Sequence, residues 1–305
     1  MKIAIIGAGL SGCNLYNNLK EKYENITIFE KSRGVGGRLS TKYIEDKFID
    51  HGTSSLVPIT DDLKLFCLDL VKNGVLKAKY DEFIPKNGIN SICKFLIDEK
   101  DLVKNTKIVK AQNFNNKWIL QDENHKIYED FDLLFISIPA PQILELDIEL
   151  PNDFEQKVAN IKYDSVFSVI LYSNKNIKLD QNRFYENPDI ENIIDNSKKY
   201  GLKDFSSYII HSSREFANCV NHKSKEDIYE IFLENLDEEL QEELNKFEII
   251  PHLWKYAFAK SSLDMPYFLN NEKNLGICGD YFNYNNLEAT LLSSELLGNV
   301  TFNNP

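Results

Sequence analysis

Residues 1–12 read MKIAIIGAGLSG, and this stretch decides the fold. The apolar run Lys2–Ile6 is typical of a short β-strand, and the residues from Leu10 to Tyr23 have helical spacing. A second predicted strand, Ile26–Glu30, ends in an acidic residue. The order of strand, helix and strand, with glycines at the first turn, predicts an α/β protein that begins with a Rossmann-type βαβ unit.

The turn between the first strand and the helix has the G-x-G-x-x-G spacing of a dinucleotide-binding loop. Gly7 permits the tight turn, Gly9 lets the backbone approach a pyrophosphate, and Gly12 lets the helix and strand pack closely. The helix then starts at Leu10 and Ser11, where free N–H groups can bind phosphate oxygens. This loop therefore predicts a bound dinucleotide.

A second glycine cluster decides which dinucleotide. Glu30 stands where an acid accepts the hydroxyls of the adenosine ribose and disfavours the 2′-phosphate of NADP, so NAD and FAD remain. Residues 31–41 then read KSRGVGGRLST, so two glycine-rich segments are predicted to approach one ligand. An NAD-only domain does not need the second segment. The pair therefore favours FAD.

Composition excludes several other classes of protein. The chain has 305 residues, of which 43% are hydrophobic, enough for a large core and usually for two domains. Its net charge of −12 argues against nucleic-acid binding. We find no secretory signal, no stretch long enough to span a membrane, and five cysteines without metal-binding spacing. These features predict a reduced, cytoplasmic protein without a structural metal, and with neither nucleic acid nor membrane as partner.

The order of predicted elements indicates a first domain interrupted by a second. Phe131–Ile138 is an almost unbroken apolar run typical of a buried central strand. The sequence then changes to strands of alternating polar and apolar residues and an acidic helix, Lys225–Leu244. After this, a buried strand at Leu275–Cys278 and a helix at Leu287–Leu297 again resemble the elements of the first domain. We predict an FAD-binding domain of residues 1–74, 100–146 and 268–305, and a discontinuous substrate domain of residues 75–99 and 147–267 built on a mixed β-sheet with helices.

The second glycine cluster, together with Asp50-His51-Gly52, resembles the glutathione-reductase-type flavoproteins of the amine oxidase class, and specifically the renalase family. The segments IPAPQ at 138–142, HLWKYA at 252–257 and CGD at 278–280 are similar to that family in order and spacing. The resemblance extends over nearly the whole chain. It implies noncovalent FAD that accepts a hydride at N5 from a small-molecule donor, with isomeric dihydronicotinamide dinucleotides as candidate donors and O2 as acceptor.

The resemblance also implies roles for single residues. Asp280 would bind the ribityl or pyrophosphate part of FAD, and the N-terminus of the helix near Asn286 would face the flavin pyrimidine. Trp254 and His211 are candidates for the substrate pocket, and on a strand Trp254, Tyr256 and Phe258 would share one face. The predicted cofactor-binding set is Gly7, Gly9, Leu10, Ser11, Gly12, Glu30, Lys31, Arg33, Gly36, Gly37, Arg38, His51, Gly52, Ile108, Pro139, Gly279, Asp280, Asn286 and Leu287.

One departure from the family leaves the substrate open. Residues 53–56 read TSSL where renalase-like sequences usually have A-Q-Y-F, so an aromatic residue near the substrate is missing. An amine oxidase, a desaturase or a monooxygenase of the same fold therefore remain alternatives, as does a flavin-binding protein without turnover. The sequence does not determine the oligomeric state.

Overall fold

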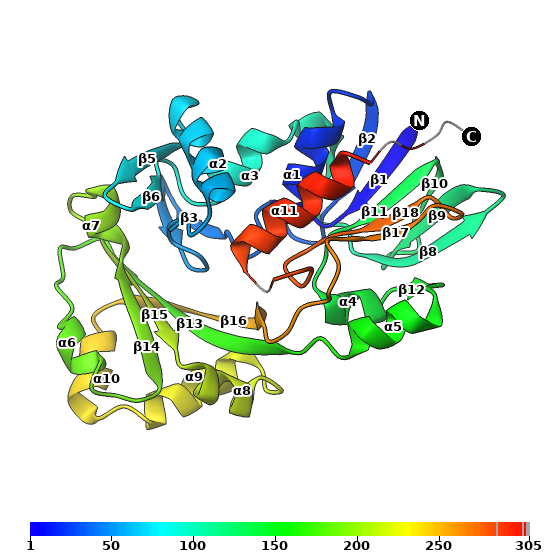
Figure 1. Ribbon diagram of the computed structural model, residues 1–305. Helices are drawn as coiled ribbons and strands as arrows, with labels where there is room; N and C mark the ends of the chain where they lie inside the picture. Colours follow the sequence, from blue (N-terminus) through cyan, green and yellow to red (C-terminus); the bar gives the residue numbers. More distant parts are fainter. Residues whose placement is uncertain (285, 301, 303–305) are drawn as a thin grey trace.

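The computed structural model describes residues 1–284, 286–300 and 302 (Figure 1). Its first sheet has six strands in the order β17-β18-β11-β1-β2-β7, and all neighbours are parallel except the pair β17–β18. The strands are β1 (Lys2–Ile6), β2 (Asn25–Phe29), β7 (Leu102–Val103), β11 (Leu133–Ile136), β17 (Phe268–Asn270) and β18 (Leu275–Ile277). The predicted βαβ unit is confirmed, and the C-terminal strands return to its sheet.

Both faces of this first sheet are covered. Along β1, Ile3 and Ile5 belong to a core beneath α1 (Leu10–Leu19) and α11 (Leu287–Gly298), whereas Ala4 and Ile6 belong to a core on the opposite face. All four residues of β11 are fully buried, which explains its unbroken apolar sequence. Figure 1 shows α1 and α11 side by side over the sheet.

A second sheet and two short helices cover the opposite face. The order is β10-β9-β8-β12, an antiparallel meander with β12 parallel to β8. Trp118, which is 1% exposed, inserts from β9 into the shared core. The elements are β8 (Ile108–Phe114), β9 (Lys117–Asp122), β10 (Ile127–Phe131), β12 (Asp147–Ile148), α4 (Ala140–Leu144) and α5 (Asn152–Ala159).

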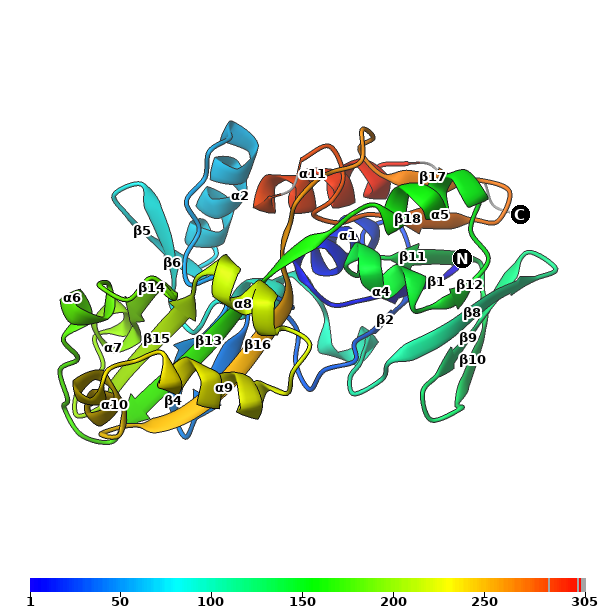
Figure 2. The same ribbon diagram turned by 90° about the horizontal axis from the view of Figure 1, so that it is seen from below.

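The third sheet forms a separate layer, with the order β14-β15-β13-β16. Helices cover one of its faces (Figure 2), and a small cluster that includes Ile49 and Ile170 packs on the other. Its strands are β13 (Tyr163–Ser173), β14 (Ile190–Asp195), β15 (Ser206–Ser212) and β16 (Glu248–Ala259), and its helices are α6 (Gln181–Phe184), α7 (Asn196–Tyr200), α8 (Arg214–Val220), α9 (Lys225–Glu234) and α10 (Glu238–Leu244).

Two expectations for this layer are corrected. We expected a mixed sheet, but its described strand pairs are all antiparallel; mixed pairing occurs in the first two sheets. We also expected one helix over Lys225–Leu244, but the chain forms α9 and α10. Asp237 separates the two helices because its side chain accepts a hydrogen bond from Leu240 N and so caps the second helix, while Leu236 turns into the core.

The remaining elements precede β7 in the chain and pack largely on the core beneath α1 and α11. Two hairpins, β3 (Thr41–Ile44) with β4 (Lys47–Asp50) and β5 (Leu76–Lys79) with β6 (Glu82–Pro85), accompany α2 (Asp61–Lys72), α3 (Ser91–Leu96) and a 3₁₀ turn at Glu99–Asp101. Ile92 and Cys93 of α3 pack in the core under α1, although residues 75–99 were predicted in the second domain. The domain boundaries stay a prediction. Among the described residues, no helix is long and apolar enough to cross a membrane.

Candidate functional site

A cavity of about 640 Å³ lies between the first sheet and β16. It opens at the carboxyl ends of the parallel strands, since Ile6, Phe29, Ser137 and Gly279 line it at or just after the ends of β1, β2, β11 and β18. Ligands of open α/β sheets bind at this edge. β16 closes the far side of the cavity with residues 252–258.

The two glycine clusters meet in this cavity. Gly9 and Gly36 form an isolated parallel bridge, and Gly36 N donates to Ala8 O at 2.9 Å. A Cβ added to Gly9 would meet no atom within 4 Å, so the space in front of Gly9 is open. Gly37 has φ +57°, and a Cβ added to it would lie 3.2 Å from the Gly9 Cα. Two backbone segments therefore approach the same open space, as the sequence predicted.

Gly12 has a different task from Gly9. A Cβ on Gly12 would lie 2.0 Å from Gly7 O, so only glycine allows α1 to pack this closely on the loop. Gly7 itself has φ +104°, a backbone conformation that glycine adopts without strain. Gly9 is the N-cap of α1 and makes no side-chain capping bond. The first N–H groups of the helix, at Leu10 and Ser11, therefore begin at the cavity wall.

Glu30 lies at the same end of the cavity and is 8% exposed. Its Oε2 accepts from Ala8 N at 2.9 Å, and its Oε1 accepts from Ser32 N at 2.8 Å. Two main-chain amides thus fix the orientation of the carboxylate and compensate its burial. Because each carboxylate oxygen has more than one lone pair, Glu30 keeps acceptor capacity toward the cavity.

Asp280 and Arg38 form an ion pair in the cavity wall. Arg38 Nη1 lies 2.7 Å from Asp280 Oδ2 and 3.1 Å from Ala257 O, and the Tyr163 hydroxyl donates to Asp280 Oδ1 at 3.0 Å. Burial alone would lower the pKa of Arg38, but the Asp280 carboxylate outweighs it and raises that pKa above its usual value. Burial followed by the Asp280 charge raises the pKa of Tyr163, so its hydroxyl stays a donor. The pair ties the second glycine cluster to the C-terminal turn and to β16.

A second helix N-terminus reaches the cavity at α11. Asn286, its N-cap, accepts from Ala289 N at 3.0 Å through its side chain. Asn286, Leu287 and Thr290 all line the cavity. The positive end of the α11 dipole is therefore available to a negative group there.

Aromatic side chains form the far end. Trp254 Nε1 donates to His51 O at 3.0 Å, and its ring stacks on the His51 ring with centroids 5.3 Å apart. His252 packs edge-on against both rings at 4.3 and 5.0 Å. Burial lowers the pKa of His252 to about 4, and burial together with His252 lowers that of His51 to about 3. Both imidazoles are neutral near pH 7.

The cavity brings together most of the predicted residues. A register shift between β13 and β16 interrupts the expected alternation of Trp254, Tyr256 and Phe258, but all three line the cavity, with Phe258 45% exposed. The other predicted residues that line it are Gly7, Gly9, Leu10, Ser11, Glu30, Lys31, Gly36, Gly37, Arg38, Ile108, Pro139, Gly279, Asp280, Asn286 and Leu287.

Within the described chain, Gly12, Arg33, His51, Gly52 and His211 are not among the lining residues. Arg33 is exposed, and His211 lies behind the wall, where its Nε2 contacts His51 O at 3.1 Å. Sequence reasoning also missed several lining residues. Ser137 could have been found from its place after a buried parallel strand, and His252 from its place at the start of the HLWKYA segment. The missed residues include Thr53, Thr106, Ser137, Gln142, His252 and Thr290.

Comparison with known proteins agrees with this geometry. Residues 5–68 match the family of NAD(P)-binding Rossmann-like domains. Renalase of Mus musculus is 22% identical over an alignment of 331 positions that covers 96% of each chain. Among solved structures, putrescine oxidase bound to putrescine has a TM-score of 0.67 at 12% identity and covers 97% of this chain and 98% of its own. A fatty acid isomerase from P. acnes has a TM-score of 0.65 at 12% identity and covers 97% of both chains.

The fold and the cavity at its strand ends define an FAD-dependent oxidoreductase with a Rossmann-type dinucleotide-binding domain. Within that class the chain is renalase-like, since the similarity to renalase runs over almost its full length. The predicted Rossmann-type α/β fold, the enzyme class and the cofactor are confirmed. The two solved structures show the fold alone, and they carry different chemistries on it.

Proposed function

We propose that the cavity holds FAD noncovalently along its length and admits a small hydride donor at the β16 end. The observation that carries this proposal is the open space in front of Gly9, bordered by the second glycine segment and by the uncapped first turn of α1. A pyrophosphate needs such close access to main-chain amides. When bound, FAD supplies the acceptor for a hydride at N5, and O2 is the proposed final acceptor.

Each part of the wall has a proposed task toward the cofactor. Glu30 accepts the ribose hydroxyls, and the first amides of α1 bind the pyrophosphate. Asp280, held by Arg38 and Tyr163, binds the ribityl chain. The N-terminus of α11 at Asn286 places its positive dipole end where reduction of the flavin increases negative charge.

The far end of the cavity offers a donor a neutral aromatic wall and no carboxylate without a partner among the described lining residues. The carboxylates that line the cavity are Glu30, Glu145 and Asp280, and each already accepts a hydrogen bond or ion pair from the protein. The wall formed by His252 and Trp254 is neutral and aromatic, since burial keeps His252 unprotonated. A dihydronicotinamide ring can stack on such a wall, whereas a protonated amine would find no carboxylate there without a partner and would depend on the ring of Trp254 to hold its charge.

The test is anaerobic reduction of the purified holoprotein. We expect a yellow protein that releases FAD on acid precipitation and bleaches when mixed with the 1,2- and 1,6-dihydro isomers of NADH, with amines as control. Bleaching by an amine or a polyene, and not by these isomers, would assign the chain to a different oxidase or desaturase. A yellow protein that no donor bleaches would favour the noncatalytic alternative. The five free cysteines suit the cytoplasmic location that we also propose.

A further inference from the structure

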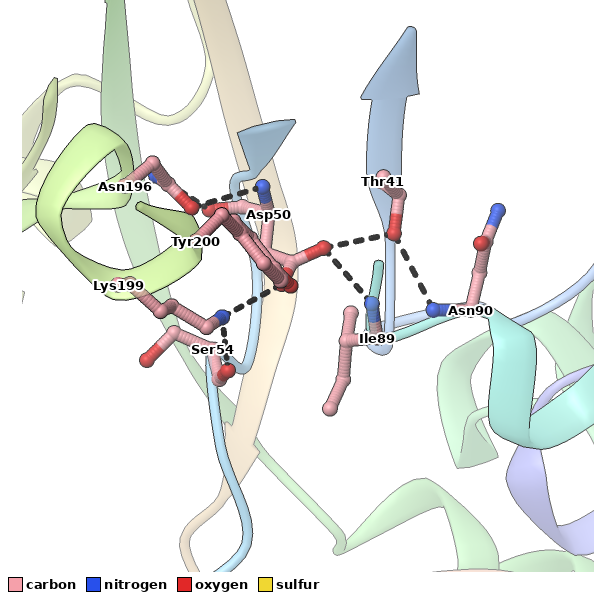
Figure 3. A network of polar contacts seen from close by, with 8 residues as sticks. All are labelled: Thr41, Asp50, Ser54, Ile89, Asn90, Asn196, Lys199 and Tyr200. Atoms are coloured by element: carbon pink, nitrogen blue, oxygen red, sulfur yellow. Dashed lines mark hydrogen bonds and ion pairs between the residues drawn. The ribbon is translucent and has the colours of Figure 1, made fainter. Parts of the chain in front are cut away.

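A buried network of charged and polar side chains surrounds Asp50 (Figure 3), the residue before His51 of the aromatic end. Asp50, the last residue of β4, is 0% exposed. Its Oδ1 accepts from Thr41 Oγ1 at 2.7 Å and from Ile89 N at 2.8 Å. Its Oδ2 accepts from Lys199 Nζ at 2.6 Å and from the Tyr200 hydroxyl. Four donors from three separate segments therefore converge on one carboxylate.

Stability alone does not explain this pair of charges. The Lys199 side chain is 9% exposed, and burial lowers the pKa of its ammonium despite the Asp50 charge beside it. A buried ion pair contributes little net stability, because the cost of removing both charges from water offsets their attraction. Such pairs do fix geometry. Lys199 Nζ also donates to Ser54 O, so one ammonium holds both ends of the segment 50–54.

The held segment supports the wall of the cavity. The carbonyl oxygen of His51 accepts from Trp254 Nε1 at 3.0 Å, His211 Nε2 at 3.1 Å and Ser168 Oγ at 3.2 Å. Gly52 passes so close to Trp254 that an added Cβ would lie 3.2 Å from its ring. Thr53 lines the cavity directly. A shift of residues 51–53 would therefore move both Trp254 and Thr53.

We propose that the Asp50–Lys199 pair is a positioning device for the donor end of the cavity, acting through the His51 carbonyl on the ring of Trp254. α7 of the third layer supplies Lys199 and Tyr200, while the loop after β4 supplies the residues that touch the cavity wall. The pair thus fixes the distance between the Trp254 wall of the cavity and the glycine segments on the opposite wall. Its effect on donor use rests on the proposed function; its effect on Trp254 does not.

Trp254 can report its own position, because the chain has only two tryptophans, Trp118 and Trp254. In a Trp118→Phe background, the double variant Asp50→Asn/Lys199→Met removes both charges and leaves neither partner buried alone. We expect acrylamide quenching of Trp254 to increase at least about twofold and its fluorescence anisotropy to fall. Tyr200→Phe removes one donor to Asp50 and should act in the same direction, which keeps the test available if the double variant does not fold.

The matched control is Asp132→Asn/Lys117→Met in the same background. This pair joins β9 to the residue before β11, and Asp132 also accepts from Lys2 N, away from the cavity lining. Quenching should stay within error of the parent protein. An unchanged Trp254 signal in folded Asp50 and Tyr200 variants would overturn the proposal, and so would an equal change in the control.

Donor kinetics then test the consequence for function. We expect the KM for the dihydronicotinamide donor to rise about tenfold in the Asp50/Lys199 variant, with the dissociation constant of FAD changed less than twofold. A merely destabilised protein would lose FAD and donor binding together, which would contradict a positioning role. If Trp254 responds but no donor reduces the parent protein, the proposed function fails and the positioning device stands.

Discussion

The two ends of the cavity are built in different ways. The dinucleotide end consists of main-chain groups: glycines 7, 9, 36 and 37, the first turn of α1, and a carboxylate held by two backbone amides. The donor end consists of side chains from β16, supported by the segment after β4. Backbone geometry restricts the sequence to glycine, whereas a side-chain wall tolerates many residue types.

This difference explains what stays constant and what varies between similar proteins. The first end lies in residues 5–68 for its greater part, and these residues match the family of NAD(P)-binding Rossmann-like domains. A putrescine oxidase and a fatty acid isomerase share the fold with this chain, although their names state different reactions. The cofactor can therefore be inferred from backbone requirements, and the donor only from the side chains of β16 and residues 51–53.

We expect the largest effect from a substitution that disrupts only the dinucleotide end of the cavity. Gly9→Val puts a branched side chain into the open space in front of Gly9, so we expect FAD affinity to fall at least about 100-fold, or about 2.7 kcal/mol. Folding should be little affected, since the added Cβ meets no protein atom within 4 Å. FAD content after gel filtration and fluorescence titration of the apoprotein measure this.

Gly34→Val is the matched control. Gly34 lies in the second glycine cluster, is exposed, has no atom within 4 Å of an added Cβ, and does not line the cavity among the described residues. We expect this variant to retain stoichiometric FAD. Retention of FAD by Gly9→Val, or equal loss in both variants, would show that the Gly9 turn is not the pyrophosphate site.

The sequence predicted the first end well because each feature is local. β1, the start of α1 and β18 follow from apolar runs next to glycine, and the functional glycines are spaced within two short segments. Glu30 follows from its place at the end of β2. What the sequence did not reveal is that Glu30 is held by Ala8 N and Ser32 N, because those bonds depend on how the loop closes.

The second end could be predicted only in part. Trp254 was identified from its motif. His211 was predicted in the pocket, but it does not line the cavity and contacts the His51 carbonyl from β15. The three donors to the His51 carbonyl come from β13, β15 and β16, far apart in sequence. Their convergence depends on strand register, which no local pattern specifies. The Asp50–Lys199 pair, 149 residues apart, was missed for the same reason.

A smaller effect is expected from a change at the donor end. Trp254→Leu removes the indole ring and its hydrogen bond to His51 O, so we expect kcat/KM for the donor to fall about 10- to 100-fold, or about 1.4 to 2.7 kcal/mol. FAD content should stay stoichiometric. Trp118→Phe, a change at the fully buried tryptophan of β9, is the control and should leave the kinetics unchanged. Loss of FAD from Trp254→Leu would mean that the two ends are not separable.

The smallest effect is a pH dependence that belongs to the donor end. Burial lowers the pKa of His51 to about 3 and of His252 to about 4, and it also lowers the pKa of His211. In the unfolded chain the pKa of each histidine is about 6.5. Below that pH the unfolded state binds protons that the folded state does not, so the free energy of unfolding falls as the pH falls toward 4, by up to about 1.4 kcal/mol per pH unit for each histidine.

Urea denaturation at pH 7, 6 and 5 measures this loss of unfolding free energy. His252→Gln should remove about a third of the loss, because the three histidines with a lowered pKa contribute to it. Replacement of the exposed His125 by Asn is the control and should leave the loss unchanged. The pKa of carboxylates such as Asp132 is lowered by Lys117 and Lys2 N despite burial, and they lose their contribution below about pH 5. The loss of stability between pH 7 and pH 5 therefore comes mainly from the histidines. Main-chain amides do not titrate there. Because the folded protein keeps His51 and His252 neutral above about pH 4, FAD should remain bound at pH 5 and the KM for the donor should be unchanged there. Release of FAD at pH 5 would show that the dinucleotide end does not rest on main-chain groups alone.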